Sequence, residues 1–315
     1  MSRVSNRQAT FERRDVNSLT LASKLHIHER TNGGQPVLTS PSRTGKMRLS
    51  IIVPLCNEEP SIEELKDKLL LLQDRVSAKY HVEYCLVDDG STDGTRMLMA
   101  SVVPPGATCQ LSCHERNRGV GAAIRTGLAL VTGRIVCTID ADCSYRPEDL
   151  VTLIDMVASG DADVAVASPY HPKGAVMGVP YWRLLLSQQC SRLYRLVSPL
   201  KLYTYTSIFR AYSQSAAKDM QFESDGFVSA VEMLLCAYHK GYSVREAPMV
   251  LFARQSGYSK LRIAQTVLSH FALLSRAARS SLMKVFVQTL RLRQADLTGT
   301  RQPSLSAPPS PSEEK

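Results

Sequence analysis

The segment RIVCTIDADCSY, residues 134–145, joins a run of apolar residues to two acidic residues at its end. Asp140 and Asp142 are separated by one alanine, and in an extended segment residues i and i+2 point to the same side. The two carboxylates therefore face one place, where their like charges repel each other unless a cation or a donor lies between them. A buried strand followed by a solvated turn has the same pattern, so other parts of the chain must distinguish the two.

Two earlier apolar runs also end in polar residues. RLSIIVPL is followed by Asn57 and Glu58, and VEYCLV is followed by Asp88 and Asp89. Helical patterns separate these runs, and strands that alternate with helices predict an α/β fold with a doubly wound, mostly parallel sheet flanked by helices. Ligands bind at the carboxyl ends of strands in such sheets. We therefore expect the three polar clusters to share one edge of the sheet.

The 315 residues, of which 44% are hydrophobic, are sufficient for a single α/β domain with tails. Residues 1–46 are polar and aperiodic, and we predict a disordered N-terminal arm. Residues 47–262 form one continuous globular pattern, and residues 263–293 read as a basic amphipathic helical segment. Residues 294–315 are rich in Pro and Ser and are predicted to be a disordered tail.

Charge and cysteine usage restrict the partners and the compartment. A formal charge of +9 favours anionic partners, but the aromatic-rich basic motifs of nucleic-acid modules are missing, so we expect no nucleic acid partner. The 8 cysteines are scattered singly, several of them in apolar runs, as in reduced cytosolic proteins. We find neither a signal-peptide core nor a stretch of about 18–20 apolar residues. These features predict a cytoplasmic protein.

A cluster of carboxylates at the edge of a sheet in a basic protein indicates a divalent cation that carries an anionic ligand. Mg²⁺ prefers oxygen ligands and is usually held by one or two carboxylates plus substrate phosphates. Asp88 or Asp89 has a second interpretation, in which it accepts a hydrogen bond from a nucleotide base or ribose. A dehydrogenase is disfavoured, because VPLCNEE stands where a glycine-rich dinucleotide motif would follow the first strand.

Seven motifs then identify a family resemblance. In order they are VPLCNEE, LVDDGSTDGT, NRGVGAAIRTGL, IDADCSYRPEDL, TSIFRAY, GFVSAVEMLLCAYHKGY and EAPMVLFARQSGYSKL. Together they resemble the family 2 glycosyltransferases, and within them the dolichyl- or polyprenyl-phosphate mannose or glucose synthases, over roughly residues 48–275. The first four motifs imply a GT-A catalytic domain that uses a UDP- or GDP-hexose. The last three imply a lipid phosphate acceptor.

The resemblance also implies roles for individual residues. The positions that would bind the donor are Pro54, Asn57, Glu58, Asp88, Asp89 and Ala141. Asp140 and Asp142 would hold Mg²⁺ or Mn²⁺ and the sugar diphosphate. Arg183 and Ser187 would receive the acceptor phosphate, and Arg254 and Lys260 would close over the donor phosphates. Arginine suits this task because its guanidinium forks onto phosphate oxygens.

The expected reaction is metal-dependent transfer of a hexose to polyprenyl phosphate, with inversion at the anomeric carbon. A phosphate acceptor is already anionic and needs no general base, whereas a hydroxyl acceptor needs a carboxylate within hydrogen-bond reach. Asp225, in ESDGF, is the candidate base for the hydroxyl case, although this motif is also typical of a helix cap. Two alternatives therefore stay open: a family 2 enzyme that acts on a hydroxyl, and a non-catalytic subunit that binds nucleotide sugars.

The sequence departs from the family pattern at several positions. Cys56 stands where a tyrosine often packs on the base, and Ser144 stands where some relatives carry a glutamine that joins the metal shell. Pro169 replaces an arginine that would contact the acceptor phosphate, with His171 or Lys173 as nearby substitutes. The acceptor is therefore less firmly implied than the donor.

The segment after the catalytic motifs is basic and amphipathic. Between Ala247 and Ala295 there is no Asp or Glu, and apolar residues recur at helical spacing. Such a helix lies on an anionic membrane surface, or it packs its apolar face on the core or on a membrane subunit. The first arrangement predicts a peripheral protein on the cytoplasmic face of a membrane.

Overall fold

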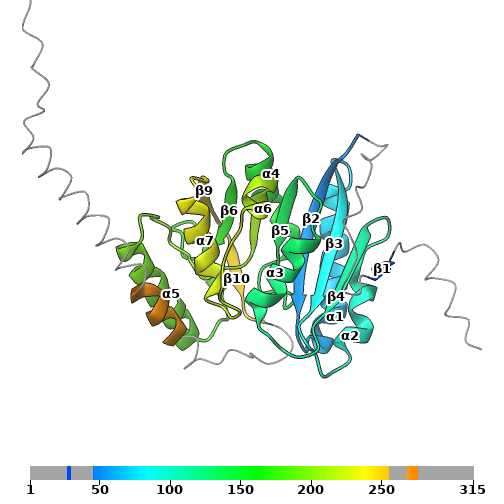
Figure 1. Ribbon diagram of the computed structural model, residues 1–315, viewed down its shortest axis with the longest axis horizontal. Helices are drawn as coiled ribbons and strands as arrows, with labels where there is room; N and C mark the ends of the chain where they lie inside the picture. The colour runs from blue at the N-terminus through cyan, green and yellow to red at the C-terminus, as the bar shows by residue number, and fades with distance from the viewer. Residues whose placement is uncertain (1–26, 30–44, 255–267, 276–315) are drawn as a thin grey trace, which may run out of the picture.

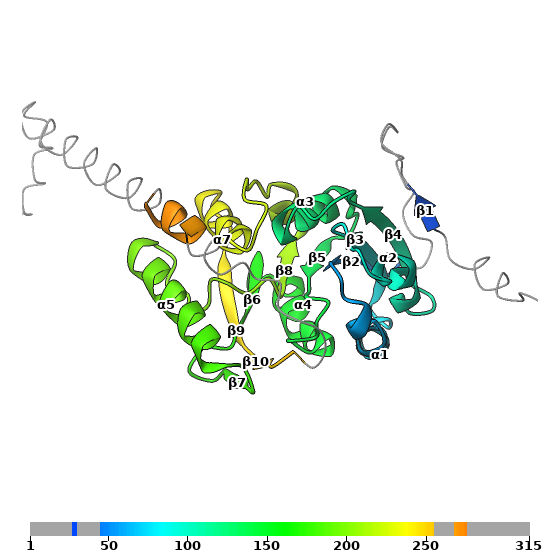
Figure 2. The same ribbon diagram turned by 90° about the horizontal axis from the view of Figure 1, so that it is seen from below.

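The computed structural model describes residues 27–29, 45–254 and 268–275. An eight-stranded sheet in the order β1-β4-β3-β2-β5-β8-β6-β9 forms the centre of this part of the chain, and helices cover both of its faces (Figures 1 and 2). The strands of this sheet are β1 (Ile27–Glu29), β2 (Met47–Leu55), β3 (Tyr80–Asp88), β4 (Thr108–Cys113), β5 (Ile135–Thr138), β6 (Val164–Ser168), β8 (Arg210–Ser213) and β9 (Val244–Pro248). A small parallel sheet pairs β7 (Ala175–Met177) with β10 (Val250–Phe252).

The helices alternate with the strands along the chain. They are α1 (Ile62–Val76), α2 (Thr95–Leu98), α3 (Val120–Leu130), α4 (Leu150–Ala158), α5 (Tyr181–Val197), α6 (Gln214–Lys218) and α7 (Ser229–His239). Short 3₁₀ helices, η2 (Glu59–Ser61), η3 (Met99–Val102) and η4 (Pro147–Asp149), lie at the ends of α1, α2 and α4. Residues 268–275 are helical as well. This order confirms the predicted α/β fold with a doubly wound sheet.

Two apolar layers hold the helices against the sheet. On one face, α1 and α4 bury side chains such as Leu65, Leu69 and Leu153 against β2, β3 and β5. Leu65, Leu69 and Leu72 are four and three residues apart and form the single buried stripe of an amphipathic helix. On the other face, α3, α6 and α7 form the second layer, which also includes Tyr194 of α5.

The sheet is mostly parallel, with one reversal. β2 pairs in parallel with β3 and with β5, whereas β8 runs antiparallel to both β5 and β6. The parallel pairs bring the carboxyl ends of β2, β3 and β5 to one edge. That edge positions the site described below.

The N-terminal arm differs from expectation in one place. Residues 27–29 lie within the segment predicted to be disordered, yet they form β1 and pair in parallel with β4. The outer edge of β4 offers unpaired backbone N–H and C=O groups, and an added strand satisfies them. The remainder of the arm up to residue 44, and the tail 294–315, lie outside the described residues.

The basic segment 263–293 is described only at residues 268–275. Leu273 is buried in the second apolar layer there, and Tyr194 of α5 donates a hydrogen bond to the backbone carbonyl of His270 at 3.3 Å. The short helix thus lies beside α5, as both views show (Figures 1 and 2). Across the described ranges, none of the helices has the length and apolar character needed to cross a bilayer.

Candidate active site

The three polar clusters lie at the same edge of the sheet, as the sequence predicts. Leu55 at the end of β2 is in register with Asp88 at the end of β3, and the Asp89 amide donates to the Leu55 carbonyl at 2.7 Å. β5 lies on the other side of β2, and the Ile139 amide donates to the Ile52 carbonyl at 3.1 Å. The residues that follow these three strands are therefore neighbours in space.

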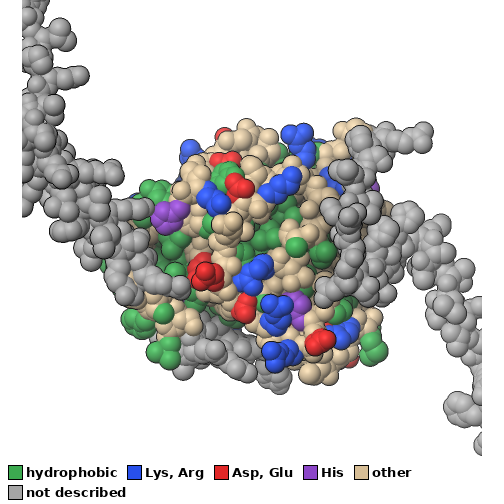
Figure 3. All heavy atoms as spheres, in the orientation of Figure 1, with side chains coloured by type: hydrophobic (Ala, Val, Ile, Leu, Met, Phe, Trp, Pro, Cys, Tyr) green, Lys and Arg blue, Asp and Glu red, His purple; other side chains and the backbone are tan. Residues whose placement is uncertain are grey.

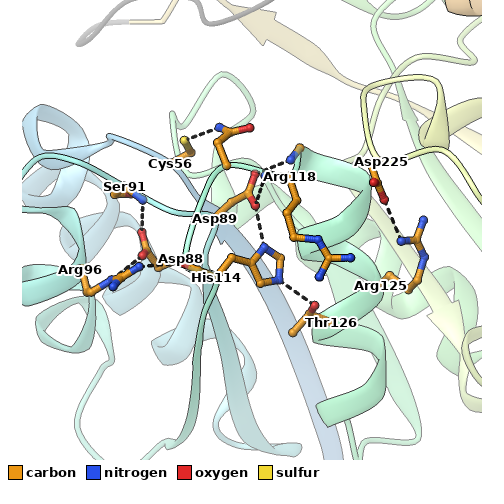
Figure 4. A network of polar contacts seen from close by, with 12 residues as sticks. Cys56, Asp88, Asp89, Ser91, Arg96, His114, Arg118, Arg125, Thr126 and Asp225 are labelled. Carbon is orange, nitrogen blue, oxygen red and sulfur yellow. Dashed lines mark hydrogen bonds and ion pairs between the residues drawn. The ribbon is translucent and has the colours of Figure 1, made fainter. Parts of the chain in front are cut away.

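Asp88 is fully buried and closes the loop that follows β3. One carboxylate oxygen accepts from the Ser91 amide at 3.2 Å, and the other accepts from Nε of Arg96 at 2.8 Å (Figure 4). Arg96 also donates to the backbone carbonyl of His114 at 2.7 Å. These bonds give Asp88 a supporting role in the wall of the site.

Asp89 is the centre of a second buried network (Figure 4). Its carboxylate accepts from the backbone amides of Arg118 and Gly119 at 3.0 and 2.7 Å, and Nδ1 of His114 lies 2.7 Å away. Because an ionised carboxylate only accepts, Nδ1 of His114 carries the proton, and Nε2 then accepts from Thr126 Oγ1 at 2.9 Å when the ring is neutral. Asp89 thus fixes the loop that leads into α3.

The loop before α7 packs on the start of α3 where glycines leave room. Gly119 has a φ of 110°, and a Cβ there would lie 2.4 Å from the carbonyl oxygen of Asp225. The same carbonyl accepts from the Gly121 amide at 2.6 Å. The Asp225 carboxylate pairs with Nη1 of Arg125 at 2.9 Å. The carboxylate that was a candidate base is therefore held by an arginine, and its carbonyl caps a helix.

Asn57, Pro54 and Ala141 lie at the same edge. The Asn57 side-chain carbonyl accepts from the Thr92 amide at 2.7 Å, and its left-handed backbone, with a φ of 49°, turns the chain after β2. Pro54 is partly exposed near the end of β2, and Ala141 is buried between the two aspartates. Cys56 accepts a contact from Nδ2 of Asn117 at 2.9 Å. These positions form the wall next to the β2 and β3 ends.

Asp140 and Asp142 differ in their surroundings. Withdrawal from water raises the pKa of the Asp140 carboxyl well above its usual value, and the neighbouring Asp142 carboxylate raises it further, whereas the Arg254 charge lowers it. No hydrogen bond or ion pair formed within the described ranges engages the Asp140 carboxylate. Asp142 accepts from the Ser144 amide at 3.0 Å and forms an ion pair with Nε of Arg254 at 3.2 Å.

Arg254 joins two of the three clusters. Its Nη2 lies 2.6 Å from a Glu58 carboxylate oxygen, so the guanidinium bridges Glu58 and Asp142. Lys260, the other residue of the late basic motif, lies outside the described residues. The structure therefore places Arg254 beside Asp142 and Glu58, and its predicted contact with the donor phosphates stays a prediction.

The residues at this edge fit a divalent cation. Two carboxylates that lie two residues apart, one of them without a bonded partner, are the kind of oxygen ligands that Mg²⁺ and Mn²⁺ accept, with substrate oxygens to complete the shell. Among the described residues, no group of three or more His, Cys, Asp and Glu side chains is arranged as a complete protein cage. A metal here would consequently depend on ligands from the substrate. Ser144 contributes its backbone amide to Asp142.

The predicted acceptor residues lie on α5. Arg183 is in the first turn of this helix and Ser187 is one turn later, so both are on the same side of it. Ser187 Oγ lies 2.8 Å from Thr206 Oγ1, and the Tyr170 hydroxyl also hydrogen-bonds Ser187. A short chain of hydroxyl groups therefore extends from α5 towards the sheet.

This chain approaches the aspartate pair through Tyr145. The Tyr145 phenol hydrogen-bonds Ser207, the neighbour of Thr206, and it is within electrostatic range of Asp140 and Tyr170. Pro169, at the position of the missing arginine, follows β6 directly. His171 packs edge-on against Tyr203, with 5.4 Å between ring centres, and lines a separate cavity of about 550 Å³. Tyr170, which directly follows Pro169, thus brings a hydroxyl group to the predicted acceptor side.

The outer face of α5 is apolar and exposed. The large hydrophobic side chains exposed there are Tyr181, Trp182, Leu185, Leu186, Leu193 and Leu196, and Leu268 and Phe271 of the adjacent helix are exposed as well. In Figure 3 hydrophobic side chains gather at the lower left over α5, whereas Lys and Arg side chains gather at the lower centre. This contiguous group, with its two helices, is defined here as the α5 face.

Arg210 and Glu232 form hydrogen bonds that support the surrounding loops. Arg210 of β8 is fully buried, and its Nη2 donates to the Tyr205 carbonyl at 3.1 Å. Its charge also lowers the pKa of Asp140. Glu232 accepts from the Ser224 amide and hydroxyl, both at 2.8 Å, which supports the loop that carries Asp225.

Sequence reasoning missed His114 and the strand that carries it. The segment TCQLSC forms β4, and His114 follows immediately, so this residue also stands at a strand end. The apolar positions alternate in this segment between Gly106 and His114, which is the pattern of a strand. That alternation was the available signal.

Comparison with known families and proteins agrees with this geometry. The family model described as glycosyl transferase family 2 matches residues 50–221. Polyprenol monophosphomannose synthase of Mycolicibacterium smegmatis is 30% identical over 241 residues, which cover 74% of this chain and 86% of that protein. Dolichol-phosphate mannosyltransferase of Pyrococcus furiosus is 26% identical over 69% of this chain and 60% of that protein.

A solved structure has the same fold. Glucosyl-3-phosphoglycerate synthase from Mycobacterium tuberculosis, in complex with Mn²⁺, UDP and glucosyl-3-phosphoglycerate, aligns with a TM-score of 0.52 and 20% identity. The alignment covers 76% of this chain and 79% of that one. At this level of identity, the similarity shows a shared fold alone.

Proposed function

Because the chain belongs to glycosyl transferase family 2 and is therefore a glycosyltransferase, we propose that it moves a hexose from a UDP- or GDP-hexose to a polyprenyl phosphate. The proposed reaction inverts the anomeric carbon and depends on a divalent metal. The 30% identical relative, a polyprenol monophosphomannose synthase, supports the choice of acceptor.

One observation carries the proposal: Asp140, which has no bonded partner among the described residues, lies within electrostatic range of Tyr145, and Tyr145 lies within the same range of Tyr170, which contacts Ser187 of α5. A transferase must hold the attacking atom of the acceptor about 3–3.5 Å from the reacting carbon of the donor. The proximity of Asp140, Tyr145, Tyr170 and Ser187 supports two adjacent subsites. Asp140 and Asp142 would hold the metal with the diphosphate, and Arg183 and Ser187 would hold the acceptor phosphate.

On the donor side, the nucleoside lies against the wall formed by Pro54, Asn57, Glu58 and Ala141. Asp88 and Asp89 support this wall through Arg96 and His114. Asp140 and Asp142 hold Mg²⁺ or Mn²⁺, which when bound neutralises charge that develops on the departing diphosphate. Arg254 and Lys260 add cationic groups for the same phosphates.

On the acceptor side, Arg183 orients the phosphate of the lipid and Ser187 donates a hydrogen bond to it. An oxygen of the acceptor phosphate forms a bond to the anomeric carbon while the bond from that carbon to the diphosphate breaks. A phosphate monoester is anionic before it reacts, so no side chain has to remove a proton. The ion pair of Asp225 with Arg125 is consistent with this mechanism.

The α5 face supports a lipid acceptor. An apolar helix face with arginines on the same helix binds the interface of an anionic membrane, where the phosphate of a polyprenyl lipid resides. Arg183, Arg192 and Arg195 belong to the same helix. The protein would thus bind peripherally, on the cytoplasmic face, with the acceptor phosphate presented to Arg183.

A transfer assay tests the proposal. The full chain is incubated with labelled UDP- and GDP-hexoses, Mg²⁺ or Mn²⁺, and a panel of polyprenyl phosphates, and the products are partitioned between organic and aqueous phases. We expect label in the organic phase that requires both the metal and the lipid phosphate. Label confined to water-soluble glycosides would overturn the lipid acceptor, and no transfer with any donor would favour a non-catalytic subunit.

The replacement at Pro169 favours one alternative, transfer to a hydroxyl of another acceptor. Proline cannot contribute the cation that an arginine would offer to a phosphate. In that case Asp225 has to leave Arg125 and act as the base. An Asp225→Asn variant separates the two, because a phosphate acceptor predicts retained turnover and a hydroxyl acceptor predicts its loss.

A further inference from the structure

Arg254 lies between two acidic residues from different strand ends. Its Nη2 is 2.6 Å from Glu58 Oε1, and its Nε is 3.2 Å from Asp142 Oδ2. The side-chain exposures are 16% for Arg254, 9% for Glu58 and 21% for Asp142, so the three groups are largely shielded from water. Ion pairs in such surroundings are screened less by salt than exposed pairs are.

A metal held by Asp142 would compete with Arg254 for one carboxylate oxygen. Asp142 Oδ1 already accepts from the Ser144 amide at 3.0 Å, and Oδ2 is the oxygen that meets Arg254. A cation coordinated by Asp142 therefore competes with the guanidinium for Oδ2. With Asp140 next to this pair and Glu58 on the other side, three carboxylates surround one resident cation, and their mutual repulsion is relieved by whichever cation is present.

The backbone before Arg254 is anchored to the loop that carries Asp142. The Phe252 amide donates to the Ser144 carbonyl at 2.8 Å, and the Ala253 amide donates to the Met177 carbonyl at 2.8 Å. The Arg146 guanidinium lies 4.5 Å from the centre of the Phe252 ring. Because the backbone is held in place, a displaced Arg254 side chain keeps its charge near the aspartates, within reach of a bound diphosphate.

We propose that Arg254 is the resident counter-cation of the donor site, and that a divalent metal displaces its guanidinium from Asp142 and so makes it available to the nucleotide diphosphate. This inference rests on the proposed function and adds an exchange of cations to it. Metal alone binds weakly because it must break an ion pair. Metal together with nucleotide binds more tightly, because the released guanidinium gains phosphate oxygens. The two ligands are then positively coupled, and the coupling is reciprocal.

The test measures binding, separately from turnover. Mn²⁺ binding to the full chain is followed by electron paramagnetic resonance, without nucleotide and with saturating UDP or GDP. For Arg254→Met we expect Mn²⁺ alone to bind about tenfold more tightly than it does to the unmodified chain, since each 1.4 kcal/mol corresponds to a factor of ten. We also expect the enhancement by nucleotide to fall about tenfold, because no guanidinium is released to the phosphates.

A matched control keeps the charge change but moves it away from Asp142. Arg146→Met also removes one positive charge close to β10. The Arg146 guanidinium, however, packs over the Phe252 ring and does not pair with Asp142. We expect this variant to bind Mn²⁺ like the unmodified chain. Arg254→Lys should restore part of the nucleotide enhancement, since lysine keeps a charge for phosphate but cannot span both acids as a guanidinium does. Thermal unfolding of each variant confirms that the fold is retained.

Two outcomes separate this inference from the proposed function. If Asp142→Asn abolishes Mn²⁺ binding while Arg254→Met leaves the affinity for Mn²⁺ alone unchanged or lower, the metal site stands and the exchange is wrong. If Mn²⁺ binds to the unmodified chain and to Asp142→Asn equally, the metal assignment fails, and the exchange fails with it. Equal tightening in Arg146→Met and Arg254→Met would also overturn the exchange, because it would indicate a general effect of charge.

Discussion

At the carboxyl edge of β2, β3 and β5 five acidic side chains lie close together, whereas the α5 face presents large apolar side chains to solvent. Most of the acids at the edge are matched to a specific donor, as Asp88 is to Arg96 and Asp89 is to His114. On α5, Tyr181 is 75% exposed and Leu196 is 78% exposed. Most acids of the edge thus have their partners within the chain, whereas the α5 face lacks a covering partner among the described residues.

The acidic side chains at the edge also fall into two groups. Asp88 and Asp89 are saturated by donors close to them in the fold, so they maintain the shape of the loops. Asp140 has no bonded partner among the described residues, and Asp142 shares Arg254 with Glu58. Substitution of Asp88 or Asp89 should therefore lower the stability of the fold. Substitution of Asp140 or Asp142, which are available to a ligand, should instead lower the rate of turnover. The predictions below test that division.

The largest effect is expected at Asp142. Asp142→Asn removes a carboxylate from the proposed metal pair, and turnover should fall by roughly a thousandfold, because electrostatic stabilisation of the leaving group is usually the largest single catalytic contribution. The labelled transfer assay measures this. Stability should change less than turnover, because the side-chain oxygen of the introduced asparagine can still accept from the Ser144 amide. Turnover within tenfold of the unmodified chain would contradict the metal assignment.

The second effect is expected at Asp89 and concerns stability. Asp89→Asn places an amide where two backbone N–H groups and His114 converge, and one of these donors loses its acceptor. The free energy of unfolding should fall by about 2–3 kcal/mol, which is the range for a buried hydrogen bond to a charged group. Urea denaturation measures the change. An Asp89 variant as stable as Asp142→Asn would remove the proposed division between the acids.

A third prediction concerns the α5 face. Replacement of Leu186 and Leu196 by glutamine removes apolar area from this face, and binding to vesicles that contain anionic lipid should weaken by at least about tenfold. The matched control replaces Leu70 and Leu71, which are exposed on α1 at 45% and 47%. Flotation of the vesicles measures the bound fraction. Equal losses in both double variants would show that the α5 face has no special role.

The smallest effect is expected at His270, where the short helix meets α5. Burial lowers the pKa of His270, and its Nδ1 lies 3.1 Å from the Tyr194 hydroxyl. The unfolded chain therefore binds a proton at this residue more readily, and stability should decrease as the pH falls through the ordinary histidine pKa of about 6.5.

Thermal unfolding at pH 7.5 and at pH 5.5 measures this dependence. The difference in Tm between the two pH values should be larger in the unmodified chain than in His270→Gln by about 1–3 °C, which corresponds to less than 1 kcal/mol for a domain of this size. An identical pH dependence in both proteins would show that His270 does not contribute.

Much of the fold was predictable from local patterns. The apolar runs that end at Asn57, Asp88 and Asp140 form β2, β3 and β5, and their ends meet at one edge as expected. β4 was missed because TCQLSC shows only a short alternation, without the continuous apolar run that marks β2, β3 and β5. The reversed direction of β8 was also outside the prediction, since strand direction depends on the path of the preceding loops and not on side-chain periodicity.

The candidate site was predicted unevenly for a similar reason. Asp140 and Asp142 were located by their spacing, and Arg254 was located by its motif. The partners of these residues were not. Arg254 meets Glu58 at a separation of 196 residues, and Asp89 meets His114 at a separation of 25. The sequence offered Asp225 as a candidate base or as part of a helix cap, and only the packing of its loop on α3 pairs its carboxylate with Arg125.

By itself, the sequence determined that the segments leading to Asn57, Asp88 and Asp140 are strands and that acids stand at their ends, because periodicity and motif spacing are properties of neighbouring residues. The tertiary structure decided what each acid does. The register of parallel strands brings Leu55 and Asp88 level, and the loop after β10 carries Arg254 to Asp142. Whether a carboxylate is saturated or available depends on these long-range contacts, since its electrostatic energy is set by the groups within a few ångströms and not by its neighbours in the chain.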